Sequence, residues 1–69
     1  MDLTPRQQQV IDLIRVTVNQ RGYPPSVREI GEALGMRSSA TVWFHLDALV
    51  KKGALRRDPY KSRAIQVVD

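Results

Sequence analysis

Helix start and stop signals follow one another along this chain, and they limit the folds that it can form. Thr4 precedes Pro5 and is followed three residues later by Gln7, the pattern of an N-terminal capping box with proline in the first turn. Gly22 then supplies the left-handed residue that commonly follows the end of a helix. A helix over about residues 4–21 is therefore predicted. The apolar residues that recur in it at helical spacing, and that we expect to face the core, are Val10, Ile11, Ile14 and Val18.

A second helix follows two consecutive prolines, which interrupt the first because the residue before a proline avoids the helical region. Ser26 and Glu29 form another capping box, and Gly35 ends a helix over about residues 27–34. Gly31 either lets another helix approach closely or is a tolerated helical glycine that costs about 1 kcal/mol. The apolar stripe of this helix consists of Val27, Ile30 and Leu34.

A third helix is predicted over about residues 39–52, with Gly53 at its end. Phe44 lies on roughly the opposite side of this helix from its apolar stripe, and Trp43 lies on the shoulder between them. A large ring on the side where water is expected adds nothing to the core, so it needs a partner or a covering segment. The stripe that should face the core consists of Val42, Leu46, Leu49 and Val50.

The hydrophobic period changes after the third helix. Residues 54–68 suit two short strands, with "DPYK" supplying the turn between them. In this hairpin Leu55, Ile65 and Val67 should point to the core, whereas the arginines and Gln66 should face water. Three helices followed by a hairpin is the order of a winged helix-turn-helix. The predicted fold class is therefore mainly α with a small β-hairpin (α+β), in a single domain over residues 1–69.

Composition limits the chemistry of the chain. Its 69 residues include no cysteine and one histidine, which excludes disulfides and thiolate metal sites and argues against zinc. No nucleophile–base pair or phosphate-binding loop is visible, and His45 is expected to pack or hydrogen-bond. We expect no enzyme, catalytic residue, cofactor, metal or small-molecule site. The apolar runs are too short for a membrane span and no signal peptide is visible, so a cytoplasmic chain is expected.

A net charge of +4 and an isoelectric point near 10.1 make the chain basic, which suits nucleic acid, an acidic membrane surface or an acidic protein. Basic residues concentrate after the third helix and around the hairpin. This concentration favours a phosphate-binding strip over a merely solvated face, which remains the alternative. The residues expected to contact DNA phosphates are Arg6, Arg28, Arg37, Lys51, Lys52, Arg57, Lys61 and Arg63.

The second and third helices, joined by a short turn, form a helix-turn-helix. The major groove of DNA admits one α-helix, so the third helix can present its N-terminal residues and its outer face to base edges. For Phe44 the contact would be with thymine methyl groups. Alternatives remain open, because a neighbouring loop or the hairpin can cover Phe44, Trp43 can pack at the core margin, and a serine can serve only as the helix cap. The residues expected to read bases are Ser38, Ser39, Ala40, Thr41, Trp43 and Phe44.

A family resemblance extends over nearly the whole chain. The segments that carry it are "LTPRQQQVIDLIR", "RGYPPSVREIGEALG", "SSATVWFHLDALVKKG" and "RRDPYKSRAIQV". In order and spacing they resemble the N-terminal DNA-binding domain of the LexA repressors, which control the bacterial SOS response to DNA damage. The resemblance implies a winged helix-turn-helix of a bacterial or phage repressor. It further implies that double-stranded palindromic operators of damage-response genes are bound by a homodimer.

In the family the start of the third helix reads bases, which on this chain implies Ser38, Ala40, Thr41, Trp43 and Phe44. Family members carry polar or small residues at the last two of these positions, so the operator sequence is left open. Family repressors continue into a domain that dimerises and cleaves its own linker with a Ser–Lys dyad. Because the chain ends at Asp69, we expect an excised domain or a free-standing relative that cleaves nothing and is a monomer in isolation.

Trp43 and Phe44 also allow a second interpretation of the chain. In it the protein is a winged-helix interaction module, and the two rings form the hydrophobic hot spot of a protein interface. Salt separates the two interpretations, because binding through several phosphate contacts weakens steeply with added salt and a ring-centred protein interface does not.

Overall fold

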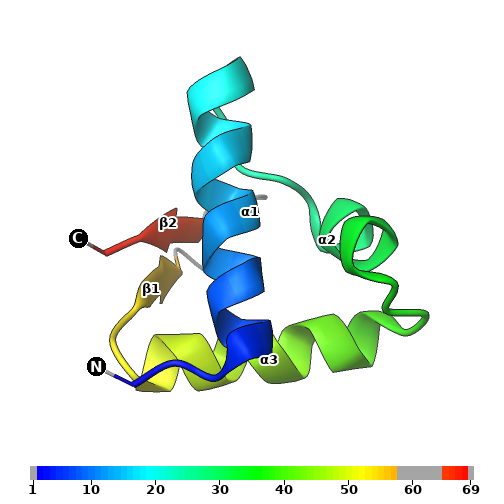
Figure 1. Cartoon of the computed structure of the whole chain (residues 1–69), viewed down its shortest axis with the longest axis vertical. Coiled ribbons are helices and arrows are strands. Elements are labelled where there is room, and N and C mark those ends of the chain that lie inside the picture. The colour runs from blue at the N-terminus through cyan, green and yellow to red at the C-terminus, as the bar shows by residue number, and fades with distance from the viewer. Residues whose placement is uncertain (1, 58–64, 69) are drawn as a thin grey trace.

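The computed structural model describes residues 2–57 and 65–68. Figure 1 shows the first helix upright, with the short second helix on one side of it and the hairpin on the other. The third helix crosses the first near the N-terminal end of the first. This arrangement confirms the predicted α+β class and fits a winged helix-turn-helix. The elements are α1 (Pro5–Arg21), α2 (Val27–Leu34), α3 (Ser39–Lys51), β1 (Leu55–Arg57) and β2 (Ile65–Val67).

Local capping explains where the helices begin. The Thr4 hydroxyl accepts from the backbone N–H of Gln7 at 3.1 Å, and the Gln7 side chain accepts from the Thr4 N–H at 3.0 Å. At α3 the Ser38 hydroxyl accepts from the N–H of Ala40 at 3.1 Å, so Ser38, and not Ser39, is the cap. Each of these bonds satisfies a donor that the helix itself leaves free.

The buried core joins the inner faces of the helices to the start of the hairpin. Two predicted core positions are wrong, because Val18 is 38% exposed and Val50 is 37% exposed. Val18 lies near the end of α1 that extends past α3 and the hairpin (Figure 1). Val50 follows Leu49 in sequence and is therefore turned about 100° away from the buried stripe of α3. The buried apolar residues are Val10, Ile11, Ile14, Ile30, Val42, Leu46, Leu49, Ala54 and Leu55.

Gly31 sets how closely α2 approaches α3. A Cβ atom at this position would lie 3.0 Å from the carbonyl oxygen of Met36 and 3.4 Å from Cγ2 of Val42. That space is too tight for a side chain unless its neighbours move. The expectation that Gly31 permits a close helix approach is confirmed at Val42 of α3, and the still closer neighbour is the backbone of the turn at Met36.

The hairpin pairs β1 and β2 in antiparallel register, with Leu55 opposite Val67 and Arg57 opposite Ile65. Leu55 is buried, and Ile65 and Val67 pack against the core as predicted. Side chains alternate between the faces of a strand, so Arg57 shares the inner face with Leu55. The expectation that every arginine of the hairpin faces open water is therefore incomplete. The predicted "DPYK" turn lies outside the described residues.

Candidate nucleic-acid interface

The outer face of α3 carries the most exposed large apolar side chain of the described residues, Phe44, which is 71% exposed. Val42 and Leu46, on the opposite side of the helix, are 1% and 2% exposed. The edge of the Phe44 ring meets the His45 ring, with centroids 5.5 Å apart and planes at 79°. The predicted outward position of Phe44 is confirmed.

The N-terminal end of α3 presents small, exposed side chains beside Phe44. Ser39, Ala40 and Thr41 are exposed, and Ser38 is exposed while it caps the helix. The first turn of α3 contains no acidic residue. Its small side chains can therefore approach a polyanion closely, with no carboxylate in this turn to repel it.

Trp43 differs from the other predicted base-reading residues because it already has contacts on the protein. Its ring is half-buried and packs against the core. The guanidinium carbon of Arg57 lies 4.0 Å from the centroid of the ring. Arg57 also approaches Asp47, with 3.4 Å between Nη1 and Oδ1. Trp43 therefore joins α3 to β1, a contact that sequence reasoning did not find.

Lys52 has an internal role that the sequence did not suggest. Its Nζ donates to Oε1 of Gln7 at 2.7 Å and to the carbonyl oxygen of Asp2 at 2.9 Å. Gln7 is 7% exposed and belongs to the Thr4 capping box. Lys52 therefore ties the N-terminal segment and α1 to the end of α3, which leaves it less available for phosphates than its exposed neighbour Lys51.

The remaining predicted phosphate contacts lie in different surroundings. Arg6 donates to the carbonyl oxygen of Leu34 at 3.2 Å, and Arg28 pairs with Glu32 at 3.1 Å. Arg37 is exposed and directly precedes the cap of α3. Lys61 and Arg63 lie outside the described residues. Among the described candidates, Arg37 and Lys51 stand at the two ends of α3.

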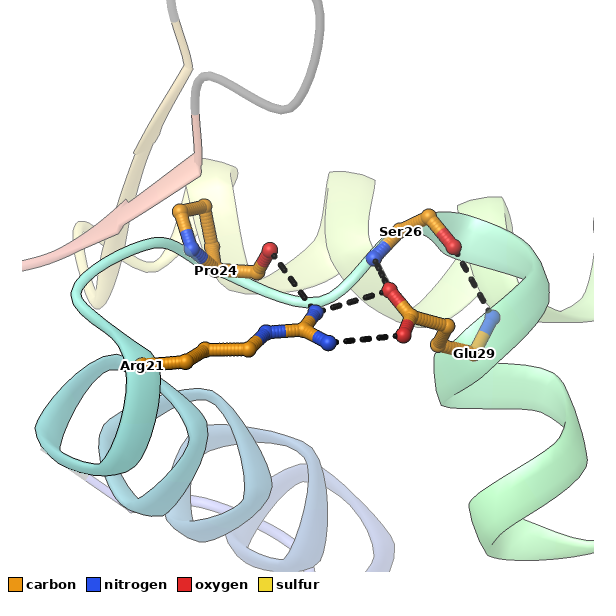
Figure 2. Close-up of polar contacts among 4 residues, drawn as sticks. All are labelled: Arg21, Pro24, Ser26 and Glu29. Atoms are coloured by element: carbon orange, nitrogen blue, oxygen red, sulfur yellow. Dashed lines mark hydrogen bonds and ion pairs between the residues drawn. The ribbon is translucent and has the colours of Figure 1, made fainter.

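A polar network joins α1 to α2: it contains the predicted capping box of Ser26 and Glu29, and the contacts of Arg21 are the part that sequence reasoning missed. Figure 2 shows the Arg21 guanidinium donating to both carboxylate oxygens of Glu29, at 2.8 and 2.9 Å, and to the carbonyl oxygen of Pro24 at 3.4 Å. Glu29 also accepts from the Ser26 N–H at 2.8 Å, while the Ser26 hydroxyl accepts from the Glu29 N–H at 3.1 Å. We call Arg21, Pro24, Ser26 and Glu29 the α1–α2 joint.

Hydrogen bonding in the joint changes its ionisation. The Arg21 side chain and then the Ser26 backbone N–H lower the pKa of Glu29 from 4.5 to about 2. The hydrogen bond to Glu29 raises the pKa of Arg21 in turn. Both groups stay charged at neutral pH, so the joint holds α2, and with it the helix-turn-helix, against α1.

Two other features are absent from the part of the chain that the structure describes. Within it no three histidine, cysteine or acidic side chains gather in a way that would hold a metal ion. Nor does any described helix have the length and apolar character needed to cross a membrane.

Comparison with known proteins places the chain in a family context. A family model described as the LexA DNA binding domain matches residues 1–64. Proteins called LexA repressor are 60% identical over 67 residues in Halalkalibacterium halodurans, 58% over 67 in Geobacillus sp. WCH70 and 56% over 66 in Bacillus mycoides. These matches cover 97%, 97% and 96% of this chain, and 32% of each relative. The chain thus spans about a third of the length of the curated relatives that it matches.

Proposed function

The chain belongs to the LexA DNA-binding domain family, and from this premise we propose that it is the sequence-specific, double-stranded-DNA-binding part of a repressor of damage-response (SOS) genes. In this proposal α3 enters the major groove and the hairpin is the wing. Two copies of the chain occupy the two halves of a palindromic operator. The protein acts on DNA in the bacterial cytoplasm and is encoded by a bacterium or by a phage.

The observation that carries the proposal is the exposed outer face of α3. Phe44 has 71% of its surface in water while the opposite side of the helix is buried. A ring in this position can contact thymine methyl groups, and the small residues before it let the helix approach base edges. We propose that bases are read by residues drawn from Ser38, Ser39, Ala40, Thr41 and Phe44.

Phosphate contacts at both ends of α3 would fix its register in the groove. Arg37 precedes the helix, and Lys51 is its last residue. Lys51 follows Phe44 by seven residues, which places it on nearly the same side and about 10 Å further along the helix. Its ammonium can therefore reach the phosphates beside the groove that Phe44 enters.

Selection of bound duplexes from a random library tests the proposal. Recovery of a two-fold-symmetric site would support sequence-specific binding by two copies. Failure to enrich any sequence, with wild-type protein that is folded, would overturn it. The same selection determines the operator sequence, including the bases that Phe44 contacts.

A protein-interaction module is the second candidate, and the exposure of Phe44 is what favours it. In that case Phe44 and Trp43 would form one apolar surface. The Arg57 guanidinium lies over the Trp43 ring, however, so the two rings do not present a continuous apolar patch. A partner bound with little dependence on salt would support this candidate, whereas steep loss of duplex binding with salt supports the repressor.

We further propose that the isolated chain is a monomer that pairs only on its operator. The chain exposes 4835 Å² of surface. A standard stable interface takes about 800 Å² from each partner, which is about a sixth of that surface. Sedimentation should therefore give a monomer at micromolar concentration, and a stable dimer without DNA would contradict this proposal.

A further inference from the structure

Three side chains meet where the wing joins α3, and we call Trp43, Asp47 and Arg57 the wing group. The Arg57 guanidinium carbon lies 4.0 Å from the centroid of the Trp43 ring, and Nη1 lies 3.4 Å from Oδ1 of Asp47. Trp43 and Asp47 are four residues apart on α3 and are therefore neighbours on its surface. Arg57 reaches them because it shares the inner face of β1 with Leu55.

We propose that Trp43 is a positioning residue that holds Arg57 for a DNA phosphate, and that Asp47 competes with this phosphate for the same guanidinium. The proposal deepens the proposed function and rests on it. It also changes the role of Trp43, which reads no base. The half-buried ring packs against the core and carries the guanidinium, so little of it is left for a base edge.

The geometry allows the Trp43 ring to hold the Arg57 guanidinium while its N–H donors remain available to a phosphate. A guanidinium stacked on a ring keeps the N–H donors at its edge free to bind a phosphate in a bidentate manner. The contact with Asp47 is single and long, and the Arg57 and Asp47 side chains are 47% and 56% exposed. A phosphate can therefore displace the carboxylate while the ring keeps Arg57 in place.

This competition lowers affinity wherever Arg57 contacts a phosphate, on random duplex and on the operator alike. On random duplex the contact of Arg57 with a phosphate replaces its contact with Asp47, so the net gain is small. On the operator the base contacts of α3 add to that gain. Asp47 therefore weakens binding to both duplexes by the same factor without touching a base, and its removal is best measured on random duplex, where phosphate contacts dominate.

Fluorescence tests the positioning step without DNA. Trp43 is the only tryptophan in the chain, so its emission reports this site alone. Arg57→Ala should uncover the ring and move its emission to longer wavelength, whereas Arg56→Ala, the same change at the neighbouring residue, should not. Equal spectra for the wild type and Arg57→Ala would overturn the stacking of Arg57 on Trp43 in solution.

Binding to a 20-base-pair duplex of mixed random sequence tests the competition. Asp47→Asn should tighten binding by about two- to fivefold at low salt, the range expected for release of an exposed ion pair. Asp12→Asn removes the same charge from α1 and gives the effect of charge alone. When Arg57 is alanine, Asp47→Asn should tighten binding to the random duplex by no more than Asp12→Asn does. If Asp47→Asn still tightened binding more than Asp12→Asn when Arg57 is alanine, the proposed competition would be wrong.

The role of Trp43 is tested by two substitutions at the same position. Trp43→Phe keeps an aromatic face for Arg57, whereas Trp43→Leu keeps apolar volume without one. The leucine variant should bind the random duplex about two- to fivefold more weakly than the phenylalanine variant, and this difference should vanish when Arg57 is alanine. If the effects of the Trp43 and Arg57 substitutions on affinity were additive, Trp43 would contact DNA itself and would not act through Arg57. Failure of the wild type to bind any duplex would instead overturn the proposed function.

Discussion

In two parts of the molecule an arginine lies near an aromatic ring and pairs with a carboxylate, and the two arginines differ in how many of their donors are bonded. In the α1–α2 joint Arg21 lies 4.3 Å from the ring of Tyr23 and pairs with Glu29 through two bonds of 2.8 and 2.9 Å. In the wing group Arg57 lies 4.0 Å from a ring as well, but it reaches its carboxylate through one contact of 3.4 Å.

The difference extends to the surroundings of each pair. Glu29 also accepts from the backbone of Ser26, and Arg21 also donates to the Pro24 carbonyl oxygen. The side chains of Arg21 and Glu29 are 31% and 40% exposed, against 47% and 56% for Arg57 and Asp47. An arginine whose donors are shared among fixed acceptors stabilises the fold, whereas one with a single long contact remains able to bind a ligand. The comparison predicts that changes at the joint affect stability and that changes beside the wing group affect binding.

The largest effect is expected beside the wing group, at Phe44. Phe44→Ala should leave the free energy of unfolding within about 0.5 kcal/mol of the wild type, because the ring is exposed. It should cost about 1–3 kcal/mol of affinity for the selected operator, by analogy with other lost base contacts, and much less on random duplex. Thermal unfolding and titration of both duplexes measure these quantities. Equal losses on the two duplexes would show that Phe44 does not read bases.

The next effect concerns the joint and should appear in stability alone. Ser26→Ala removes the hydroxyl that caps α2, and loss of such a cap costs about 1 kcal/mol. Ser39→Ala is the matched control, since Ser39 is exposed at the first position of α3 and caps nothing. It should change stability by less than about 0.5 kcal/mol. Denaturant unfolding gives the free energy of unfolding of each variant. Equal values for the two variants would mean that the hydrogen bonds of the joint are not formed in solution.

A pair of adjacent lysines extends the comparison to phosphate binding. Lys51→Ala should reduce the slope of log affinity against log salt by about 0.9, the value for one lost phosphate contact. Lys52→Ala should leave this slope unchanged and lower stability by about 1 kcal/mol, because Lys52 bonds to Gln7 and to the backbone of Asp2. The reverse assignment of slope and stability would show that Lys52, and not Lys51, contacts the backbone of DNA.

The parts of this structure that the sequence predicted are governed by residues close together in the chain. The capping boxes at Thr4 and Ser26 each close over three residues, and the left-handed glycines 22 and 35 follow the helices directly. Helical spacing also placed Phe44 outside and Val42 inside. It failed at Val18, because periodicity continues along α1 after its contacts with α3 and the hairpin have ended, and at Val50, because helical spacing does not give the width of the buried stripe.

The parts that the sequence did not predict depend on where separate elements meet. The bond from Lys52 to Gln7 joins residues 45 positions apart, and its existence requires the end of α3 to lie beside the start of α1. The stacking of Arg57 on Trp43 likewise requires the register of the wing. A basic residue counted from composition is thus available to DNA only if the fold leaves its donors free, and Arg37 and Lys51 meet that condition better than Lys52.

The smallest expected effect is a change of stability in acid, which arises from the joint. The pKa of Glu29 is about 2 in the folded protein, below its ordinary value of 4.5, so the charged form is favoured by folding. Its contribution to stability is therefore fully present above pH 4.5 and is lost as the pH falls from about 4.5 to about 2. Because the pair lies partly in water, solvent screening keeps this contribution small.

NMR titration of the Glu29 carboxyl measures this effect directly. Arg21→Met removes the largest cause of the low pKa, so the pKa of Glu29 should rise toward 4.5. It should stay below that value, because the Ser26 N–H still donates to the carboxylate. The difference in melting temperature between the wild type and Glu29→Gln should become smaller as the pH falls from 4.5 to 2. A titration of wild-type Glu29 near 4.5 would mean that the two bonds to Arg21 do not persist in solution, and the contrast between the closed joint and the open wing group would disappear.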